Sequence, residues 1–302
     1  MDRQKDYIVF QCYGHERVFH ECAYALLSLS RLYGPGKLSN TEIWIYTDNP
    51  VWFGSFKDCS LPLKYKAIDN NTIKQWSGKI DFVHRVKIEI LKDFTSHEKG
   101  NILYLDTDVV FTHSIDKMMK DINEGKLYMH IMEGIISEEG NAVLRKLNKY
   151  LQQDGKRELN EKPLQSMAMW NAGVLGFNTK HTGLLDEVLA FTDNEYPKFP
   201  KHIIEQFAFS VFFQLKDTVK AAAPYIFHYW NLKEAGLVLS SFFSHFKDKS
   251  WEELTRLSSL VQIHTLMQEK ANFFRNRGLA GSVLNKYWIP AKPNWEELQK
   301  QL

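Results

Sequence analysis

Cysteine is scarce in this chain of 302 residues, and neither sign of charge is in large excess. The three cysteines, Cys12, Cys22 and Cys59, are too few for a disulfide framework, and no Cys-x-x-Cys pair suggests a zinc site. The formal net charge is only +2. We therefore expect no nucleic-acid partner, because nucleic-acid binding takes a strongly basic surface. The few cysteines fit a reducing, cytoplasmic setting.

Long apolar runs are absent as well, so the sequence predicts neither a membrane span nor a signal peptide. Internal repeats, low-complexity segments and linker-like stretches are also missing. We expect a single domain over residues 1–302, with a core at about 7–270 and a C-terminal tail at about 271–302. The hydrophobic fraction of 44% is ordinary for a folded globular protein and gives no indication of disorder.

The first 111 residues alternate between strand-like and helix-like patterns. Apolar runs predict strands at 7–12, 42–47 and 102–105, and a shorter strand is expected at 63–68. Apolar residues at helical spacing predict helices at 15–33 and 80–94. This order is typical of an α/β fold with a parallel sheet and right-handed crossovers. For the later chain we expect strands at 127–132, 171–178 and 261–263, and helices at 138–153, 184–191, 203–214 and beyond residue 250.

Two acids directly follow the apolar strand at 102–105. Ligands of open α/β sheets bind beyond the carboxyl ends of the strands, so Asp106 and Asp108 stand where a ligand would lie. Two hard oxygen donors this close suit Mg²⁺ or Mn²⁺. The competing interpretation is a turn acid followed by a helix N-cap. The buried strand in front favours the cation site, because a charge at a sheet end is costly without a partner.

A catalytic cation needs a further ligand, and two histidines are candidates. We favour His264, which follows an apolar stretch and precedes Lys270, because a cation and an ammonium side by side would hold a diphosphate. His228, in an aromatic run, is the alternative. Arg85 and Lys87 precede the acidic strand and are candidates for balancing the diphosphate charge or binding a sugar hydroxyl, unless they belong to a solvated helix face.

The segment 103–109 resembles the Asp-x-Asp strand of GT-A-fold glycosyltransferases, and in particular the glycogenin-like and bacterial lipopolysaccharide galactosyltransferase group. That group also has an Asn-Ala-Gly-Val segment, an Asp-Gln pair and a His-x-x-Gly-x-x-Lys segment. The matching residues here are 171–174, Glu205 with Gln206, and His264 with Lys270, so the resemblance covers residues 7 to 270. The chain departs from the pattern at Glu205, which replaces Asp, and at Met267, which replaces Gly.

The resemblance implies a fold, an activity and a set of partners. The fold would be GT-A (Rossmann-like), with a mostly parallel sheet flanked by helices and a helical C-terminal region. The activity would be that of a hexosyltransferase that retains anomeric configuration and depends on Mn²⁺ or Mg²⁺. The donor would be a nucleotide diphosphate sugar, UDP-linked by preference. The acceptor would be a glycan, a lipid-linked sugar or another hydroxyl compound.

The same resemblance implies roles for individual residues. The metal ligands would be Asp106, Asp108 and His264. Asn171 and Glu205 would touch the donor sugar or the acceptor, and Gln206 would lie at the reacting face of the anomeric carbon. Residues expected to bind the donor are Gln11, Tyr13, Arg85, Lys87, Asp106, Gly173 and Lys270.

Two other functions share this pattern. In a haloacid-dehalogenase-like phosphatase, Asp106 would be the nucleophile and Asp108 the acid/base. That class needs a later strand that ends in paired acids, and Asp186-Glu187 lies instead in a helical pattern. The other alternative is a member of the fold that binds nucleotide sugars without catalysis.

The C-terminal tail mixes aromatic and basic residues, namely Phe273, Phe274, Arg275, Arg277, Lys286, Tyr287 and Trp288. Such a mixture is compatible with a weak contact to a membrane surface, which would place the protein at the inner face of the membrane beside a lipid acceptor. A packed C-terminal element is the competing interpretation, and the sequence favours it. The oligomeric state is left open.

Overall fold

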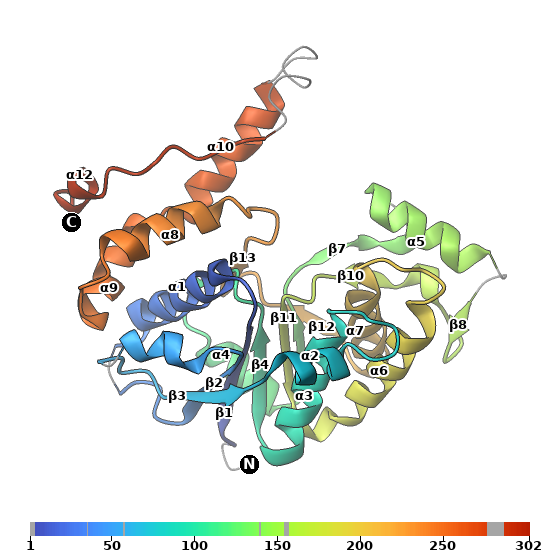
Figure 1. Cartoon of the computed structure of the whole chain (residues 1–302). Helices are drawn as coiled ribbons and strands as arrows, with labels where there is room; N and C mark the ends of the chain where they lie inside the picture. The colour runs from blue at the N-terminus through green and yellow to red at the C-terminus, as the bar shows by residue number, and fades with distance from the viewer. Residues whose placement is uncertain (1–3, 35, 57, 139, 154–156, 277–286) are drawn as a thin grey trace.

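The computed structural model describes residues 4–34, 36–56, 58–138, 140–153, 157–276 and 287–302. Its central element is a seven-stranded sheet in the order β12-β6-β11-β4-β1-β2-β3 (Figure 1). The strands are β1 (Asp6–Cys12), β2 (Thr41–Thr47), β3 (Leu63–Ala67), β4 (Asn101–Leu105), β6 (Leu127–Met129), β11 (Val174–Asn178) and β12 (Val219–Ala221). Neighbouring strands are parallel, except that β11 is antiparallel to both β4 and β6. The expected mostly parallel α/β sheet is confirmed.

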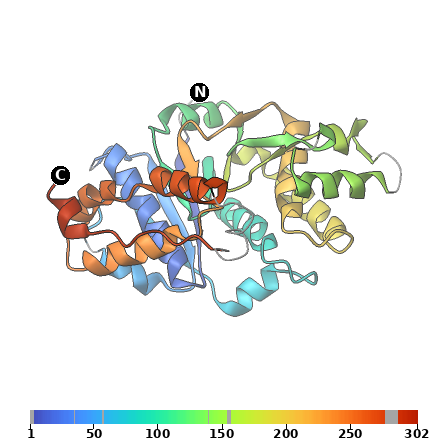
Figure 2. The same cartoon turned by 90° about the horizontal axis from the view of Figure 1, so that it is seen from above.

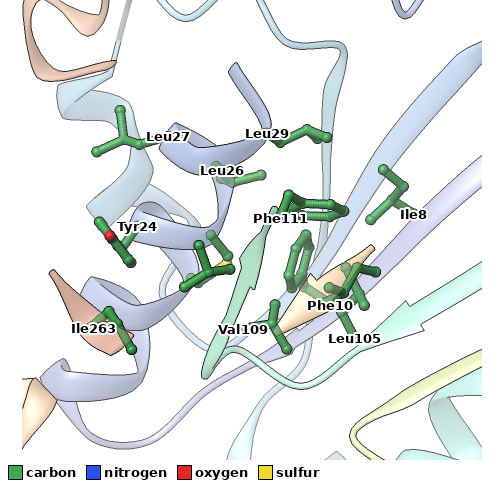
Figure 3. Close-up of a cluster of buried hydrophobic side chains, with 14 of the residues drawn as sticks. Ile8, Phe10, Tyr24, Leu26, Leu27, Leu29, Leu105, Val109, Phe111 and Ile263 are labelled. Carbon is green, nitrogen blue, oxygen red and sulfur yellow. The ribbon is translucent and has the colours of Figure 1, made fainter. Parts of the chain in front are cut away.

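Helices cover both faces of the sheet. Alternate strand residues point to opposite faces, so Ile8 and Leu105 pack in the cluster around α1 (Glu16–Leu32; Figure 3), whereas Tyr7 and Tyr104 pack in the cluster with α3 (Arg85–His97). Burial on both faces explains why these strands are continuous apolar runs in the sequence. The remaining helices of this region are α2 (Asn70–Trp76), α4 (Asp116–Asn123), α6 (Gly183–Glu195), α7 (Ile203–Lys216) and the short 3-10 helices η1 (Pro50–Ser55) and η4 (Thr179–His181).

Between β6 and β11 the chain leaves the sheet and forms a smaller unit. Its strands β7 (Met132–Ile135) and β10 (Ala168–Trp170) pair antiparallel. The helix α5 (Ala142–Gln152) shares a hydrophobic core with α7 through Leu144, Leu147 and Leu151, as the leucine spacing predicted. The unit also contains β8 (Glu158–Leu159), β9 (Lys162–Pro163), η2 (Ile136–Glu138) and η3 (Leu164–Ser166). Both views place it at the opposite end of the molecule from the C-terminal helices (Figures 1 and 2).

The C-terminal part returns to the acidic strand before it becomes helical. The strand β13 (Ile226–His228) pairs antiparallel with β5 (Val109–Phe111), which follows Asp108. The helices α8 (Ala235–His245) and α9 (Trp251–Leu257) then contact α1. They are followed by η5 (Ser258–Leu260), α10 (Ile263–Asn276) and α12 (Trp295–Gln299). The expected helical C-terminal region is confirmed. Among the helices described, none has both the length and the apolar character needed to cross a bilayer.

The strand expected at 261–263 is wrong. Val261 precedes α10, which begins at Ile263, and both side chains are buried in the cluster around α1. The hydroxyl of Tyr24 donates a hydrogen bond of 2.8 Å to the Val261 carbonyl. The apolar residues are therefore buried against helices rather than in a sheet.

Three expected elements begin later than their apolar patterns suggest. The helix expected at 80–94 begins at Arg85, because Gly78 (φ 68°) and Asp81 (φ 49°) hold the preceding segment in a turn. The helix expected at 138–153 begins at Ala142, where the side chain of Asn141 caps it. The strand expected at 171–178 begins only at residue 174.

Candidate active site

Three side chains at the carboxyl end of β4 form a cluster of potential metal ligands. Asp106 and Asp108 follow β4, and His228 ends β13. One ligand atom of each lies within 4.8 Å of the others. The register of β13 on β5 pairs His228 with Val109, the residue after Asp108, and this pairing brings the imidazole to the acids. Asp106 and Asp108 are partly exposed, while His228 is buried.

Asn171 fixes the tautomer of His228. The Asn171 amide nitrogen donates to Glu133 Oε1 (3.2 Å), so its oxygen faces the other way. That oxygen accepts from the Gly173 backbone N–H (3.0 Å) and lies 2.9 Å from His228 Nδ1. Because an amide oxygen only accepts, Nδ1 carries the proton in this pair. The other ring nitrogen, Nε2, is thereby left to face the acids.

A cation fits this donor set. Nε2 of His228 is 2.9 Å from Asp108 Oδ1. Burial lowers the pKa of His228, but the carboxylates of Asp108 and Asp106 outweigh it, so the pKa is raised above its usual value. Either a proton on Nε2 or a cation between the groups satisfies both atoms. Two carboxylates and a neutral imidazole are ligands that Mn²⁺ accepts, and the Asn171 contact is the outer-shell support typical of a metal-binding histidine.

Lys87 supplies a buried positive charge beside the cluster. Its ammonium lies 3.4 Å from Asp106 Oδ1 and 3.2 Å from Glu205 Oε1, and it donates to the Ala172 carbonyl (3.0 Å). Burial lowers the pKa of Lys87, yet the two carboxylates outweigh this and raise it. Burial also raises the pKa of Glu205 to about 7, against the opposing effect of Lys87. The pair thus holds a permanent cation next to a carboxyl group that titrates near neutrality.

A cavity of about 730 Å³ connects these groups with the smaller unit between β6 and β11. Lys87, Asp106, Asp108, Asn171, Gly173, Glu205, Gln206 and His228 all line it. On its wall, Glu133 accepts hydrogen bonds from the amide nitrogens of Gln206 (2.9 Å) and Asn171 (3.2 Å). Eight residues from five separate segments therefore share one site. Glu133 itself carried no sequence signal, because a lone acid after a predicted strand is common.

Gly173 is required by the close approach of His228. A Cβ atom built on Gly173 would lie 2.0 Å from His228 Cε1 and 2.3 Å from Nδ1. The Gly173 carbonyl also accepts from the Asp106 backbone N–H (2.8 Å), which joins the start of β11 to the acidic turn. The glycine of the Asn-Ala-Gly-Val segment therefore lets the histidine reach Asp108.

Gln11 and Tyr13 lie on the other side of Asp106, at the end of β1. The Tyr104 hydroxyl is 2.9 Å from Asp106 Oδ1 and 3.2 Å from Gln11 Oε1, and Gln11 Nε2 donates to the Tyr13 hydroxyl (3.1 Å). Neither Gln11 nor Tyr13 lines the cavity over β4, β11 and β6. The sheet order thus places them on the β1 side of the acids, whereas Glu205 and Gln206 line the cavity.

The structure does not bring His264, Lys270 and Arg85 to this cluster. His264 is exposed and stacks on Phe227 with ring centroids 4.0 Å apart. Phe227 and His228 are successive strand residues and point to opposite faces, so His264 lies on the other face from the acids. Lys270 forms an ion pair with Glu234 and donates to the Asn231 carbonyl (2.6 Å).

Arg85 joins two helices instead of lining the cavity. Its guanidinium binds Asp193 of α6 (2.7 Å), Glu89 of its own helix (2.7 Å) and the Trp76 carbonyl (2.7 Å). The sequence left a solvated helix face open as an alternative for Arg85 and Lys87, but both side chains are buried. Arg85 is buried between helices, and Lys87 faces the acids.

The tail residues expected at a membrane surface are only partly described. Arg277 and Lys286 lie outside the described residues. Phe273 and Phe274 pack partly against the α1 cluster, Arg275 is exposed, and Trp288 is buried. The membrane contact stays a prediction.

The model for glycosyl transferase family 8 matches residues 69–237, which span β4, β11 and β13 and include the potential metal ligands Asp106, Asp108 and His228. Because the match covers more than half of the chain, the chain belongs to glycosyl transferase family 8. Its α/β sheet is the GT-A type expected from the sequence. Family membership decides against the phosphatase alternative. A comparison with curated proteins gives no match.

Solved structures of glycosyltransferases resemble the chain at low identity. The apo form of mouse xyloside xylosyltransferase 1 has a TM-score of 0.49 and 11% identity, covering 72% of this chain and 84% of that chain. The apo form of GlyE from Streptococcus pneumoniae TIGR4 has a TM-score of 0.49 and 14% identity over 84% of this chain. The chain covers 63% of that GlyE chain, less than two thirds of its length. At these TM-scores the likeness adds nothing to the family assignment.

Proposed function

We propose that this protein is a metal-dependent glycosyltransferase that moves a sugar from a nucleotide diphosphate sugar, UDP-linked by preference, to a hydroxyl group of a glycan or lipid-linked acceptor. The observation that carries the proposal is the cluster of Asp106, Asp108 and His228, which borders a cavity that also contains a buried lysine. Three hard or borderline ligands and one fixed ammonium are the groups needed to hold a diphosphate.

Asp106, Asp108 and His228 would hold Mn²⁺ or Mg²⁺, so that His228 takes the role first expected for His264. A divalent cation bound there would act as a Lewis acid toward the diphosphate leaving group. Asn171 keeps the His228 ring in one orientation, and Tyr104 does the same for Asp106 through its 2.9 Å contact. The contacts from Asn171 and Tyr104 orient the side chains of His228 and Asp106 before a donor binds, which is what an effective site requires.

Lys87 and Gln206 would act on the donor from the cavity side. The ammonium of Lys87 would bind the diphosphate or a sugar hydroxyl, with Glu205 as its counter-ion. The amide nitrogen of Gln206 donates a hydrogen bond to Glu133, so the amide oxygen of Gln206 is the atom left to face a ligand. An oxygen beside the anomeric carbon stabilises positive charge that develops there. Retention through front-face displacement is the stereochemical part of the proposal. The nucleoside would extend toward Gln11 and Tyr13, on the β1 side.

The experiment is hydrolysis of a panel of nucleotide sugars with Mn²⁺ or Mg²⁺ and with EDTA, in the wild type and in two variants. Asp108→Asn should lower turnover by at least about 100-fold, since a lost metal ligand removes several kcal/mol of charge stabilisation. Asp186→Asn is the matched control, because Asp186 is an exposed acid that pairs with Lys92 on the outer helices. Unchanged turnover in Asp108→Asn with every active donor would disprove the metal role.

A further inference from the structure

The mouth of the cavity is lined by exposed apolar side chains. Twelve large hydrophobic residues are exposed in the described part of the chain, and four of them line this one cavity: Ile131, Met132, Val143 and Trp230. Exposed apolar surface costs free energy in proportion to its area. A group of such side chains beside a cavity therefore marks a surface that a ligand covers.

These four residues, which we call the apolar ledge, come from two neighbouring segments of the chain and one distant segment. Trp230 follows β13, Ile131 and Met132 lie where β6 passes into β7, and Val143 is in the first turn of α5. The Asn171 backbone N–H donates to the Ile131 carbonyl (2.9 Å). The Trp230 ring lies 5.2 Å from the His228 ring, centroid to centroid. The ledge is thus held in place and adjoins the cluster of potential metal ligands.

The same cavity also has polar lining residues, namely Lys87, Glu205, Gln206 and Glu133. A cavity with both apolar and polar lining complements a pyranose, because the ring has a face of C–H groups and a rim of hydroxyls. Aromatic side chains offer the flat, rigid surface that such a face packs against. The cavity volume of about 730 Å³ is also within the range that accommodates drug-sized ligands, so it holds more than one sugar ring.

The ledge is better placed for the acceptor than for the donor. This step rests on the proposed function, in which the donor sugar lies beside Lys87 and Glu205. Those two side chains are 4% and 2% exposed, whereas Trp230 is 41% exposed. An acceptor has to reach the donor from solvent, and the exposed ledge is the wall that it meets first. We propose that Trp230, surrounded by Ile131, Met132 and Val143, binds the acceptor, and that the acceptor is a carbohydrate whose pyranose ring stacks on the indole.

The test measures Michaelis constants for donor and acceptor in Trp230→Ala, Trp230→Phe and the wild type. The acceptors are p-nitrophenyl glycosides of glucose, galactose, xylose and N-acetylglucosamine, used with the best donor of the nucleotide-sugar panel. Trp230→Ala should raise the ratio of acceptor KM to donor KM about tenfold, because it removes the stacking surface. Trp230→Phe should stay within about threefold of the wild type, since an aromatic face remains.

Tyr65→Ala is the matched control. Tyr65 is an aromatic residue with a similar exposed fraction of 39%, but it lies on β3 at the far edge of the sheet. The ratio should not change in this variant. An unchanged ratio in Trp230→Ala, or an equal change in Tyr65→Ala, overturns the assignment of Trp230.

The remaining outcomes separate this inference from the proposed function. If donor KM rises as much as acceptor KM in Trp230→Ala, Trp230 supports the metal cluster and the ledge is not an acceptor site. If the wild type hydrolyses a donor but transfers to none of the glycosides, the carbohydrate class is wrong. If the wild type hydrolyses no nucleotide sugar, the proposed function fails and this inference fails with it.

Discussion

Replacing Gly173 by alanine should disrupt the site through a single methyl group. The three atoms nearest to the new Cβ all belong to the His228 ring, at 2.0, 2.3 and 2.7 Å. The ring cannot shift by a small amount, because Asn171 holds one nitrogen and Asp108 the other at 2.9 Å each. The imidazole must leave its position, or β11 must move away from β4.

The expected loss of stability depends on which of these two structural changes occurs. Displacing the ring breaks two hydrogen bonds, one of them to a carboxylate, and each contributes about 0.5–3 kcal/mol. Forcing β11 aside is overpacking, which costs about 1–3 kcal/mol. We therefore expect Gly173→Ala to lower the free energy of unfolding by about 2–4 kcal/mol, and to weaken Mn²⁺ binding because His228 no longer faces the acids.

Urea unfolding and titration with Mn²⁺ measure the two effects. Gly183→Ala is the control, because a Cβ at Gly183 meets no atom within 4 Å. A double variant sharpens the test: in the His228→Ala background the Gly173 substitution should cost much less, since the clashing ring is gone. If Gly173→Ala is as stable as the wild type, or if its cost is the same with and without His228, the reasoning is refuted.

Two further predictions concern Glu205 and Arg85. Because burial raises the pKa of Glu205 to about 7 from its usual value near 4.5, the folded state binds the extra proton. The free energy of unfolding should therefore fall as pH rises from about 4.5 to 7, by up to about 3 kcal/mol. Glu205→Gln should flatten this part of the profile measured by urea unfolding, and parallel profiles would contradict the shift. Arg85→Met should lower the free energy of unfolding by about 1–2 kcal/mol, because it removes the link between α3 and α6. Donor KM should stay unchanged in Arg85→Met, and a raised donor KM would restore the donor-binding role expected from the sequence.

The sequence by itself was sufficient for the centre of the fold. A strand buried on both faces has to be apolar throughout, so β4 was visible as residues 102–105, and the two acids after it marked the sheet end. The glycine of the Asn-Ala-Gly-Val segment was also visible, and the structure shows why a side chain is not accommodated there: His228 lies too close to Gly173. Local patterns reveal such features because their physical cause lies within a few residues.

Antiparallel pairing of β11, by contrast, was not predictable from its own residues. A fully buried strand has the same apolar pattern in either direction. The beginnings of α3 and α5 were misplaced for a related reason, since turn geometry at Asp81 and a cap at Asn141 override the apolar spacing. Only the structure shows the direction of β11 and the first residues of α3 and α5, because these depend on backbone geometry that apolar spacing does not encode.

The set of residues around the acids was decided by tertiary structure. His228 and His264 were both candidates, and only the pairing of β13 with β5 across more than 100 residues brings His228 to Asp108. Lys87 and Arg85 are two positions apart on one helix, yet Lys87 reaches Asp106 and Arg85 reaches Asp193. The types of the ligand residues and the positions of the strands follow from short stretches of the sequence. Which distant side chain completes the site depends on long-range packing, and this packing is fixed only when the sheet and its helices assemble.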